Sequence, residues 1–490
     1  MSNIGGKSIR PSPSIKRNYG YSAIGAAVPI IVSLVVVPLY IRHVGTERYG
    51  VMAIVWLILG YFGFFDFGLS RASANALSKL THEGPSKRAP VIVTVFYLNS
   101  LLGLFGGLAL YGVGHFMAQH MASLSVRVHI ELVRSLPWIA AMLPLNLLSS
   151  VGTGVIESRE RFAISNLLNG LGGILTQVVP ICCAIIINPS LETIVPAAFV
   201  ARAVSASAIL AYVLWTERPI DPRVLDQKQI RSLVGYGAWV SVSGLISPLL
   251  ETFDQMLVGT LLGPAALAHY AVPMSMTTRL QIIATALAKT LFPRLSRIGS
   301  READQLALKA TTTLAFGFAA VCGPAIVLAG PFLNLWLGTQ FARLSTSVAV
   351  ILLVGCWTNA VGFIPFTLLQ SQGRPDLSAK IHMAEIVPFL LSVWSLSRRF
   401  GLPGAALAWT LRVTVDLSIM LAAARMLQAG LSAIIAPAAL VTLAVGIALL
   451  AQPTGLSALA WAFCLGVAAI AAALILDETT RDLGRGLVRR

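Results

Sequence analysis

Residues 432–451 read SAIIAPAALVTLAVGIALLA, and residues 456–476 read LSALAWAFCLGVAAIAAALIL. Neither stretch contains a charged side chain, and each is long enough to cross a bilayer as a helix, which takes about 20 apolar residues. Comparable apolar runs recur along the chain. They predict an all-α polytopic membrane protein, because a membrane β-barrel would instead show short segments of alternating hydrophobicity.

The overall composition agrees with this interpretation. Of the 490 residues, 56% are hydrophobic and 11% are charged, and the mean hydropathy is +0.79. A soluble domain carries about 25% charged residues. The composition therefore excludes a disordered protein, a coiled coil and an ordinary cytosolic enzyme, since there are too few charges to coat a soluble particle.

We count fourteen candidate transmembrane spans. They cover approximately residues 19–41, 49–70, 89–114, 133–156, 163–187, 191–215, 234–260, 265–292, 307–330, 345–369, 378–397, 403–426, 432–451 and 456–476. With both termini cytoplasmic, 24 Lys and Arg residues fall on the cytoplasmic side and 6 on the other. Because cytoplasmic loops concentrate positive charge, this asymmetry predicts fourteen spans with both ends in the cytoplasm. The first run is too long for a signal peptide and is expected to remain as a span.

The net charge of +16 has the same explanation, and no nucleic-acid partner is expected. All five cysteines lie within apolar runs, so they are predicted to be small buried side chains without disulfides. There is no phosphate-binding loop, hydrolase elbow or zinc-peptidase motif. The sequence therefore predicts neither a metal site nor a cofactor.

An internal repeat indicates two lobes. Gly45 and Gly263 follow the first and seventh spans at an offset of 218 residues, and Arg202 and Arg412 lie in the sixth and twelfth spans at an offset of 210. Such a parallel repeat predicts two six-helix lobes in the same orientation. The expected organisation is a cytoplasmic tail (1–18), an N-lobe (19–215), a cytoplasmic linker (216–233), a C-lobe (234–426), two further helices (432–476) and a basic cytoplasmic tail (477–490).

Ionisable residues inside spans are candidate functional residues, because charge in hydrocarbon is costly unless it faces a cavity or a partner. Those singled out are Asp66, Arg71, Arg202, Glu251, Asp254, Arg279, Lys289, Glu385, Arg412 and Asp416. Arg412 and Asp416 are four residues apart and are predicted to form an internal ion pair. Arg279 has no acid within one helical turn, which favours an anionic ligand. Lys289 could equally snorkel to the interface, and Asp66 and Arg71 could simply mark a helix end.

Several short motifs occur in a distinctive order. They are VPLYIRHVG at 37–45, FDFGL at 65–69, DQMLVG at 254–259, LFP at 291–293 and LWLG at 335–338. Together they resemble the polysaccharide transporter family, of the O-antigen flippase type, within the multidrug/oligosaccharidyl-lipid/polysaccharide exporter superfamily. The resemblance covers nearly the whole chain.

The resemblance implies two six-helix lobes arranged as a V and, in many members, fourteen spans. It implies a non-enzymatic flippase that moves a polyprenyl-diphosphate-linked oligosaccharide from the cytoplasmic to the outer leaflet of a bacterial inner membrane. Cationic cavity residues in similar flippases point to Arg42, Arg71 and Arg279, with Asp66, Glu251, Asp254 and Lys289 as further cavity candidates. Expected partners are the lipid-linked cargo, membrane lipids, and the polysaccharide polymerase and chain-length machinery.

Other functions stay open at this point. A lipid II flippase would differ only in its cargo. A multidrug or small-cation antiporter of the same superfamily would need an acid-dominated cavity, against which the arginines argue. A membrane polymerase or acyltransferase would need a large outer loop or a catalytic histidine pair, and neither is evident.

Overall fold

A computed structural model of the chain describes residues 31–61, 77, 80, 84–120, 124–159, 161–218 and 253–476. The chain divides into two compact units, Met1–Leu245 and Ile246–Arg490, and each is described by itself. Every regular element in the described ranges is helical, so the predicted all-α fold is confirmed. The candidate residues Asp66, Arg71 and Glu251 lie outside the described residues.

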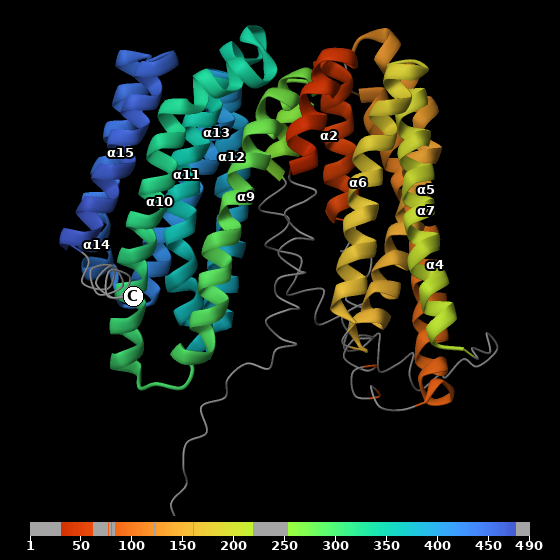
Figure 1. The fold of residues 1–490 in the computed structure, drawn as a ribbon, viewed down its shortest axis with the longest axis horizontal. Coiled ribbons are helices and arrows are strands. Elements are labelled where there is room, and N and C mark those ends of the chain that lie inside the picture. The colour runs from red at the N-terminus through yellow and green to blue at the C-terminus, as the bar shows by residue number, and fades with distance from the viewer. Residues whose placement is uncertain are drawn as a thin grey trace, which may run out of the picture. The chain divides into compact units, whose positions relative to one another are not determined.

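The first unit is a bundle of long helices (Figure 1, red to yellow-green). Its described helices are Ile31–His43, α2 (Thr46–Tyr61), α4 (Pro85–His120), α5 (Val126–Glu157), α6 (Phe162–Ile186) and α7 (Leu191–Thr216). α4 packs on α5, α5 packs on α7, and α7 packs on α6. An apolar core that includes Val95, Val155 and Ile209 fills the space between α4, α5 and α7.

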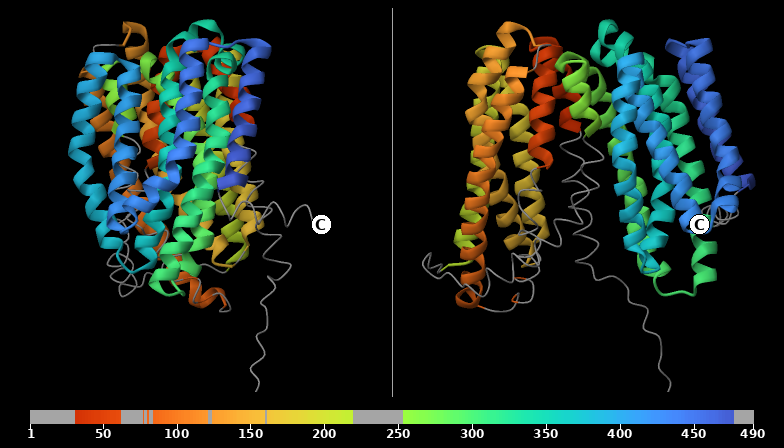
Figure 2. Two further views of the ribbon diagram at one scale, coloured as in Figure 1. Left: turned by 90° about the vertical axis from the view of Figure 1, so that its left-hand side faces the viewer. Right: turned by 180° about the vertical axis from the view of Figure 1, so that it is seen from behind.

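The second unit repeats this order of contacts (Figure 2). Its helices are a short one over 253–261, α9 (Pro264–Leu295), α10 (Ser300–Leu337), α11 (Thr339–Ser371), α12 (Pro375–Phe400) and α13 (Leu402–Ala423). α10 packs on α11, α11 on α13, and α13 on α12, as α4, α5, α7 and α6 do in the first unit. α11 is the central helix of this unit, since 72% of its apolar membrane-spanning stretch is buried inside the protein.

Two final helices extend the second unit. α14 (Leu427–Gly446) continues into the π-helical turn η2 (Ile447–Ala451), and α15 (Gly455–Leu476) follows. Both pack mainly against α10, and only 22% of each apolar window is buried inside the protein. These two helices therefore offer most of their apolar surface to the surroundings, as membrane helices at a bundle edge do.

Ten described helices are long and apolar enough to cross a membrane, which makes the protein a multi-pass membrane protein. α9 is long enough at 32 residues, but its most apolar stretch is less apolar than those of these ten helices. α2, with 16 residues, is too short to be counted with them. The predicted spans 19–41, 49–70 and 234–260 run partly outside the described residues.

Two helices extend beyond the predicted spans 89–114 and 133–156. α4 continues to His120, and α5 begins at Val126, where the Ser125 side chain accepts a hydrogen bond from the backbone N–H of Val128. Hydropathy finds the membrane-depth part of a helix, whereas capping and local contacts carry the helix further.

Candidate functional site

Helices α12 and α13 bring ionisable side chains to one level of the second unit. These helices pack together on either side of Gly401. Glu385 lies 16 residues before Gly401 and Asp416 lies 15 after it, while Phe389 and Arg412 lie 12 before and 11 after. Because the helices are antiparallel, Glu385 faces the level of Asp416 and Phe389 faces the level of Arg412.

The contacts follow this register. His382 Nε2 lies 3.5 Å from Asp416 Oδ1, and its ring stacks on Phe366 with centroids 5.7 Å apart. The guanidinium of Arg412 lies over the ring of Phe389, 5.4 Å from its centroid. Arg412 is also near enough to interact electrostatically with the carboxyl of Glu385. A mixed-charge cluster of His382, Glu385, Arg412 and Asp416, here named the α12–α13 cluster, therefore lies within the predicted membrane-spanning region.

The predicted Arg412–Asp416 ion pair does not form among the described residues. Nε and Nη1 of Arg412 have no hydrogen-bond partner there, nor do both carboxylate oxygens of Glu385 or Oδ1 of Asp416. Spacing of four residues permits an ion pair but does not impose it, and here Arg412 turns to Phe389 while Asp416 turns to His382. Arg412 therefore acts in a wider cluster rather than in an isolated pair.

Glu385 and Asp416 are neighbouring acidic residues of this cluster, and both are buried. Buried carboxylates are costly unless a cation or hydrogen-bond donor accompanies them, and Arg412 and His382 are the basic side chains of the cluster. No group of three His, Cys, Asp or Glu side chains in the described ranges is placed to hold a metal ion.

Asp254 is held apart from solvent at the edge of this region. Its side chain is fully buried and accepts a hydrogen bond from the Tyr270 hydroxyl and another from the backbone N–H of Gln255. Asp254 and Tyr270 lie on opposite sides of Gly263, so their hydrogen bond joins the helix over 253–261 to α9. Arg412 acts electrostatically on Asp254, which connects this pair to the α12–α13 cluster.

The cationic candidates on α9 differ in depth. Arg279 is half-buried and lies 15 residues after Pro264 and 16 before Leu295, at the middle of the helix. At 1.5 Å per residue it is about 22 Å from either end. Lys289 is exposed and nearer the end of the helix, and Arg42 on helix Ile31–His43 is also exposed. Of the three cations, Arg279 is therefore the one held at mid-helix depth.

A second network lies at one end of the first unit. Arg88 is fully buried; its Nε and Nη2 donate to the Glu217 carboxylate at 3.1 and 3.0 Å, and Nη2 also donates to Ser158 Oγ at 2.8 Å. Arg159 donates to the same carboxylate. Burial opposes ionisation of Glu217, but the hydrogen bonds from Arg159 and Arg88 outweigh it and lower its pKa below the ordinary 4.5. This network joins the beginning of α4 to the ends of α5 and α7.

The opposite end of the first unit has a comparable connection. Arg48 donates twice to the Glu131 carboxylate, each time at 2.7 Å, and the backbone N–H of Leu191 donates to it at 3.1 Å. Arg127 approaches the same carboxylate at 3.3 Å. Ionic contacts therefore link α2, α5 and α7 and stabilise this unit.

Sequence reasoning missed two of these partnerships. Glu217 binds both Arg88 and Arg159, and His382 contacts Asp416, but no pattern in the sequence had indicated either partnership. The antiparallel register about Gly401 places Glu385 at the level of Asp416, and His382 lies about one helical turn further along α12, so the register alone does not identify His382 as the partner. Nothing local to Arg88 identifies Glu217, which is 129 residues away.

Proteins named as transporters or flippases are similar to this chain over most of its length. A Shigella flexneri protein named as an O-antigen transporter is 27% identical, over 82% of this chain and 96% of the relative. A Haloferax volcanii protein named "Probable flippase AglR" is 22% identical, over 81% of this chain and 79% of the relative.

Solved structures share the fold. The lipid II flippase MurJ in an inward closed conformation superposes with a TM-score of 0.73 at 12% identity, covering 94% of this chain and 99% of that one. An inward-facing multidrug transporter of the MATE family, in the MOP superfamily, gives a TM-score of 0.67 at 15% identity, covering 84% and 99%. The fold is therefore that of the MOP exporters. The model of a family described as "Polysaccharide biosynthesis protein" matches residues 41–346, and the chain belongs to that family.

Proposed function

We propose that the protein is a flippase for a polyprenyl-diphosphate-linked oligosaccharide, an O-antigen or exopolysaccharide repeat unit. It moves this cargo by alternating access from the cytoplasmic to the outer leaflet of a bacterial inner membrane, with both termini in the cytoplasm. Two six-helix lobes, 19–215 and 234–426, joined by the linker 216–233, carry out the movement. The family, the MOP fold and relatives named as transporters and flippases support this proposal.

The observation that carries the proposal is the position of Arg279. A guanidinium half-buried at the middle of a 32-residue helix is costly at membrane depth and normally serves a pathway or ligand. Guanidinium groups bind phosphate oxygens through two parallel hydrogen bonds, and Arg keeps its charge in a dry site. A diphosphate linking lipid to sugar matches this chemistry, while the lipid tail can stay in the bilayer as the head crosses.

The remaining candidate residues are assigned either to the path of the cargo or to a structural contact. Arg42 and Arg71 extend the cationic path, with Asp66, Glu251 and Lys289 as further polar residues along it. Asp254 acts instead as a structural acceptor for Tyr270. No covalent step is needed. Consumption of the cargo on the far side, by a polysaccharide polymerase with chain-length machinery, would draw the reaction forward.

A leaflet-resolved assay tests the function. In a strain lacking the gene, lipid-linked oligosaccharide should accumulate in the cytoplasmic leaflet, and this chain should restore its appearance in the outer leaflet. Lipid II and a cationic dye serve as competing cargoes in the same membranes. Movement of either one in place of the lipid-linked oligosaccharide would contradict the proposal and identify the protein as a lipid II flippase or a multidrug antiporter.

Variants of Arg279 test the site itself. Transport should fall in the order Arg, Lys, Gln at matched protein levels, because Lys retains the charge without the planar fork and Gln loses the charge. Arg294→Gln is the matched control, since Arg294 lies in the last turn of the same helix and is exposed. Full activity of Arg279→Gln would remove Arg279 from the cargo path.

A further inference from the structure

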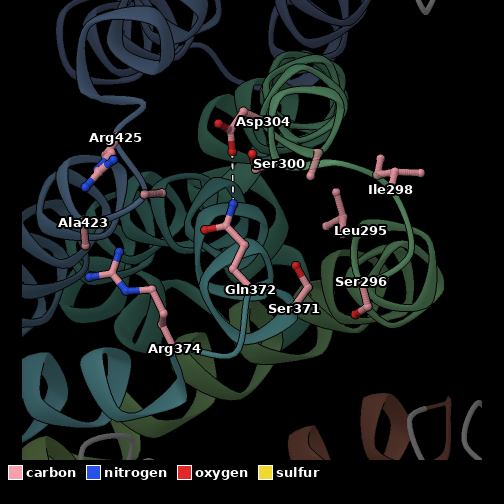
Figure 3. A pocket seen from close by; sticks show the side chains of 12 residues that line it. Leu295, Ser296, Ile298, Ser300, Asp304, Ser371, Gln372, Arg374, Ala423 and Arg425 are labelled. Carbon is pink, nitrogen blue, oxygen red and sulfur yellow. Dashed lines mark hydrogen bonds between the residues drawn. The ribbon is translucent and has the colours of Figure 1, made fainter.

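A cavity of about 500 Å³ opens at one end of the second unit (Figure 3). Three connections line it: the turn from α9 to α10, the turn from α11 to α12, and the turn from α13 to α14. This cavity lies at the end of the helices where the turns are rich in Lys and Arg, which the charge distribution assigns to the cytoplasm. It is separate from the α12–α13 cluster, which lies within the helices.

Two arginines give the cavity its charge. Arg374 and Arg425 line it from different turns, and Figure 3 shows both guanidinium groups directed to the Ala423 side of the view. Both side chains are exposed, and neither makes an ion pair or hydrogen bond within the part of the chain that the structure describes. The single acid in the lining, Asp304, accepts a hydrogen bond from Gln372 at 3.1 Å. The lining therefore carries two cations against one carboxylate.

The surrounding backbone adds positive potential and hydrogen-bond donors. α10, α12 and α14 all begin at this end, and none has a side-chain hydrogen bond capping its first turn. Uncapped helix starts carry partial positive charge and free N–H groups. Ser300 supplies a hydroxyl to the lining, whereas the hydroxyls of Ser296 and Ser371 donate to the backbone carbonyls of Phe292 and Leu368. Arg425 has a φ of +57° because it closes the end of α13: its backbone N–H donates to the carbonyl of Ala422, and that of Met426 donates to the carbonyl of Leu421.

We propose that this cavity, lined by Arg374 and Arg425, is a phosphate-binding site. Guanidinium groups, the Ser300 hydroxyl and backbone N–H groups at helix starts recognise phosphate oxygens, and 500 Å³ accommodates a phosphate ester or a diphosphate. The phosphate could belong to an anionic lipid headgroup or to a free phosphate compound, because the site lies where helix ends meet the predicted membrane surface. The site does not depend on the cargo proposed above.

The first experiment measures binding of inorganic phosphate and diphosphate to the full chain in detergent by calorimetry. Arg374→Gln and Arg425→Gln should each weaken binding about tenfold, since each removes a charge-assisted contact. Asp304→Asn should strengthen binding by removing a like charge. Arg297→Gln is the matched control, because Arg297 is exposed in the same region and does not line the cavity.

The second experiment asks whether a lipid supplies the phosphate. The chain in nanodiscs of mixed phosphatidylglycerol and phosphatidylcholine is released in a mass spectrometer, and the retained lipids are counted. Retention of phosphatidylglycerol that is lost in the Arg374→Gln, Arg425→Gln double variant supports the site with a lipid as its source. Binding of inorganic ions alone, lost in the same variants, supports it with a free phosphate as its source. Absence of both, or equal loss in Arg297→Gln, overturns the proposal.

Discussion

Gly338 has a φ of +91° and a ψ of +165°, and Gly263 has nearly the same angles, +91° and +163°. Gly45 shares the φ, at +90°. This region is open essentially to glycine alone, because a Cβ there meets the backbone. Each of the three stands immediately before a helix, at Thr46, Pro264 and Thr339. Gly45 and Gly263 are also the pair that the sequence repeat matched, so their equivalence has a conformational basis.

Gly338→Ala should destabilise the protein by about 1–3 kcal/mol through backbone strain alone. Apart from the glycine itself and its two chain neighbours, no atom lies within 4 Å of a Cβ added at this position, so a clash with the surrounding structure cannot account for the loss. Gly317→Ala in α10 is the control, since that site is equally open and has an ordinary φ. Thermal unfolding in detergent compares the two. Equal unfolding temperatures for both variants would contradict the strain argument.

Arg412 supplies the positive charge beside Glu385 and Asp416. Arg412→Ala should therefore mainly lower the amount of folded protein, because it leaves buried carboxyls without a cation. Arg412→Lys should restore abundance in part, since it returns the charge. Arg399→Ala, which changes an exposed Arg at the end of α12, should leave abundance unchanged. Quantitative immunoblotting of membranes measures this, and normal abundance with lost transport would instead assign Arg412 to the cargo path.

At the scale of elements, buried ion pairs at the ends of helices hold the first unit together. Arg88, Arg159 and Glu217 join α4, α5 and α7, and removing one partner of such a buried network costs about 3–5 kcal/mol. Apolar windows in the sequence located α4, α5 and α7 well. They could not show this network, because pairing between residues 129 positions apart depends on how the helices pack.

The Glu217 network predicts a specific pH dependence. The pKa of Glu217 is lower in the folded protein than its ordinary value of 4.5, so its stabilisation is present above pH 4.5 and is lost as pH falls through the lowered pKa. Glu217→Gln should be less stable at neutral pH and should lose part of this acid sensitivity. Glu192→Gln is the control, because the Arg134–Glu192 pair is exposed and contributes about 0–1 kcal/mol. Unfolding temperatures from pH 7 to pH 3.5 measure the difference; parallel curves for wild type and Glu217→Gln would refute it.

Across the whole molecule, the two units repeat one order of helix contacts. Glycines and arginines at matching offsets indicated two six-helix lobes in the same orientation, but they did not indicate which helices pack together. Hydropathy predicted the helical class because membrane helices satisfy their own backbone hydrogen bonds. The site was harder to predict. Periodicity placed Arg412 and Asp416 on one face of a helix, but the choice of Phe389 and His382 as their neighbours depends on packing between helices.

Membrane orientation is the remaining prediction for the whole chain. Arg294, Arg297 and Arg301 lie where α9 meets α10, whereas the α12–α13 end carries Arg398 and Arg399. When successive loops are assigned to alternate sides of the membrane, 24 Lys and Arg residues fall on one side and 6 on the other. The first group lies on the side with 24, which should be the cytoplasmic side. Alkaline phosphatase fused after Arg231 or Arg490 should be inactive, and fused after Val126 it should be active. β-Lactamase fusions at the same positions provide an independent check of the side of the membrane on which each position lies. An active phosphatase at Arg490 would place the C-terminus outside the cytoplasm and would exclude an even number of spans.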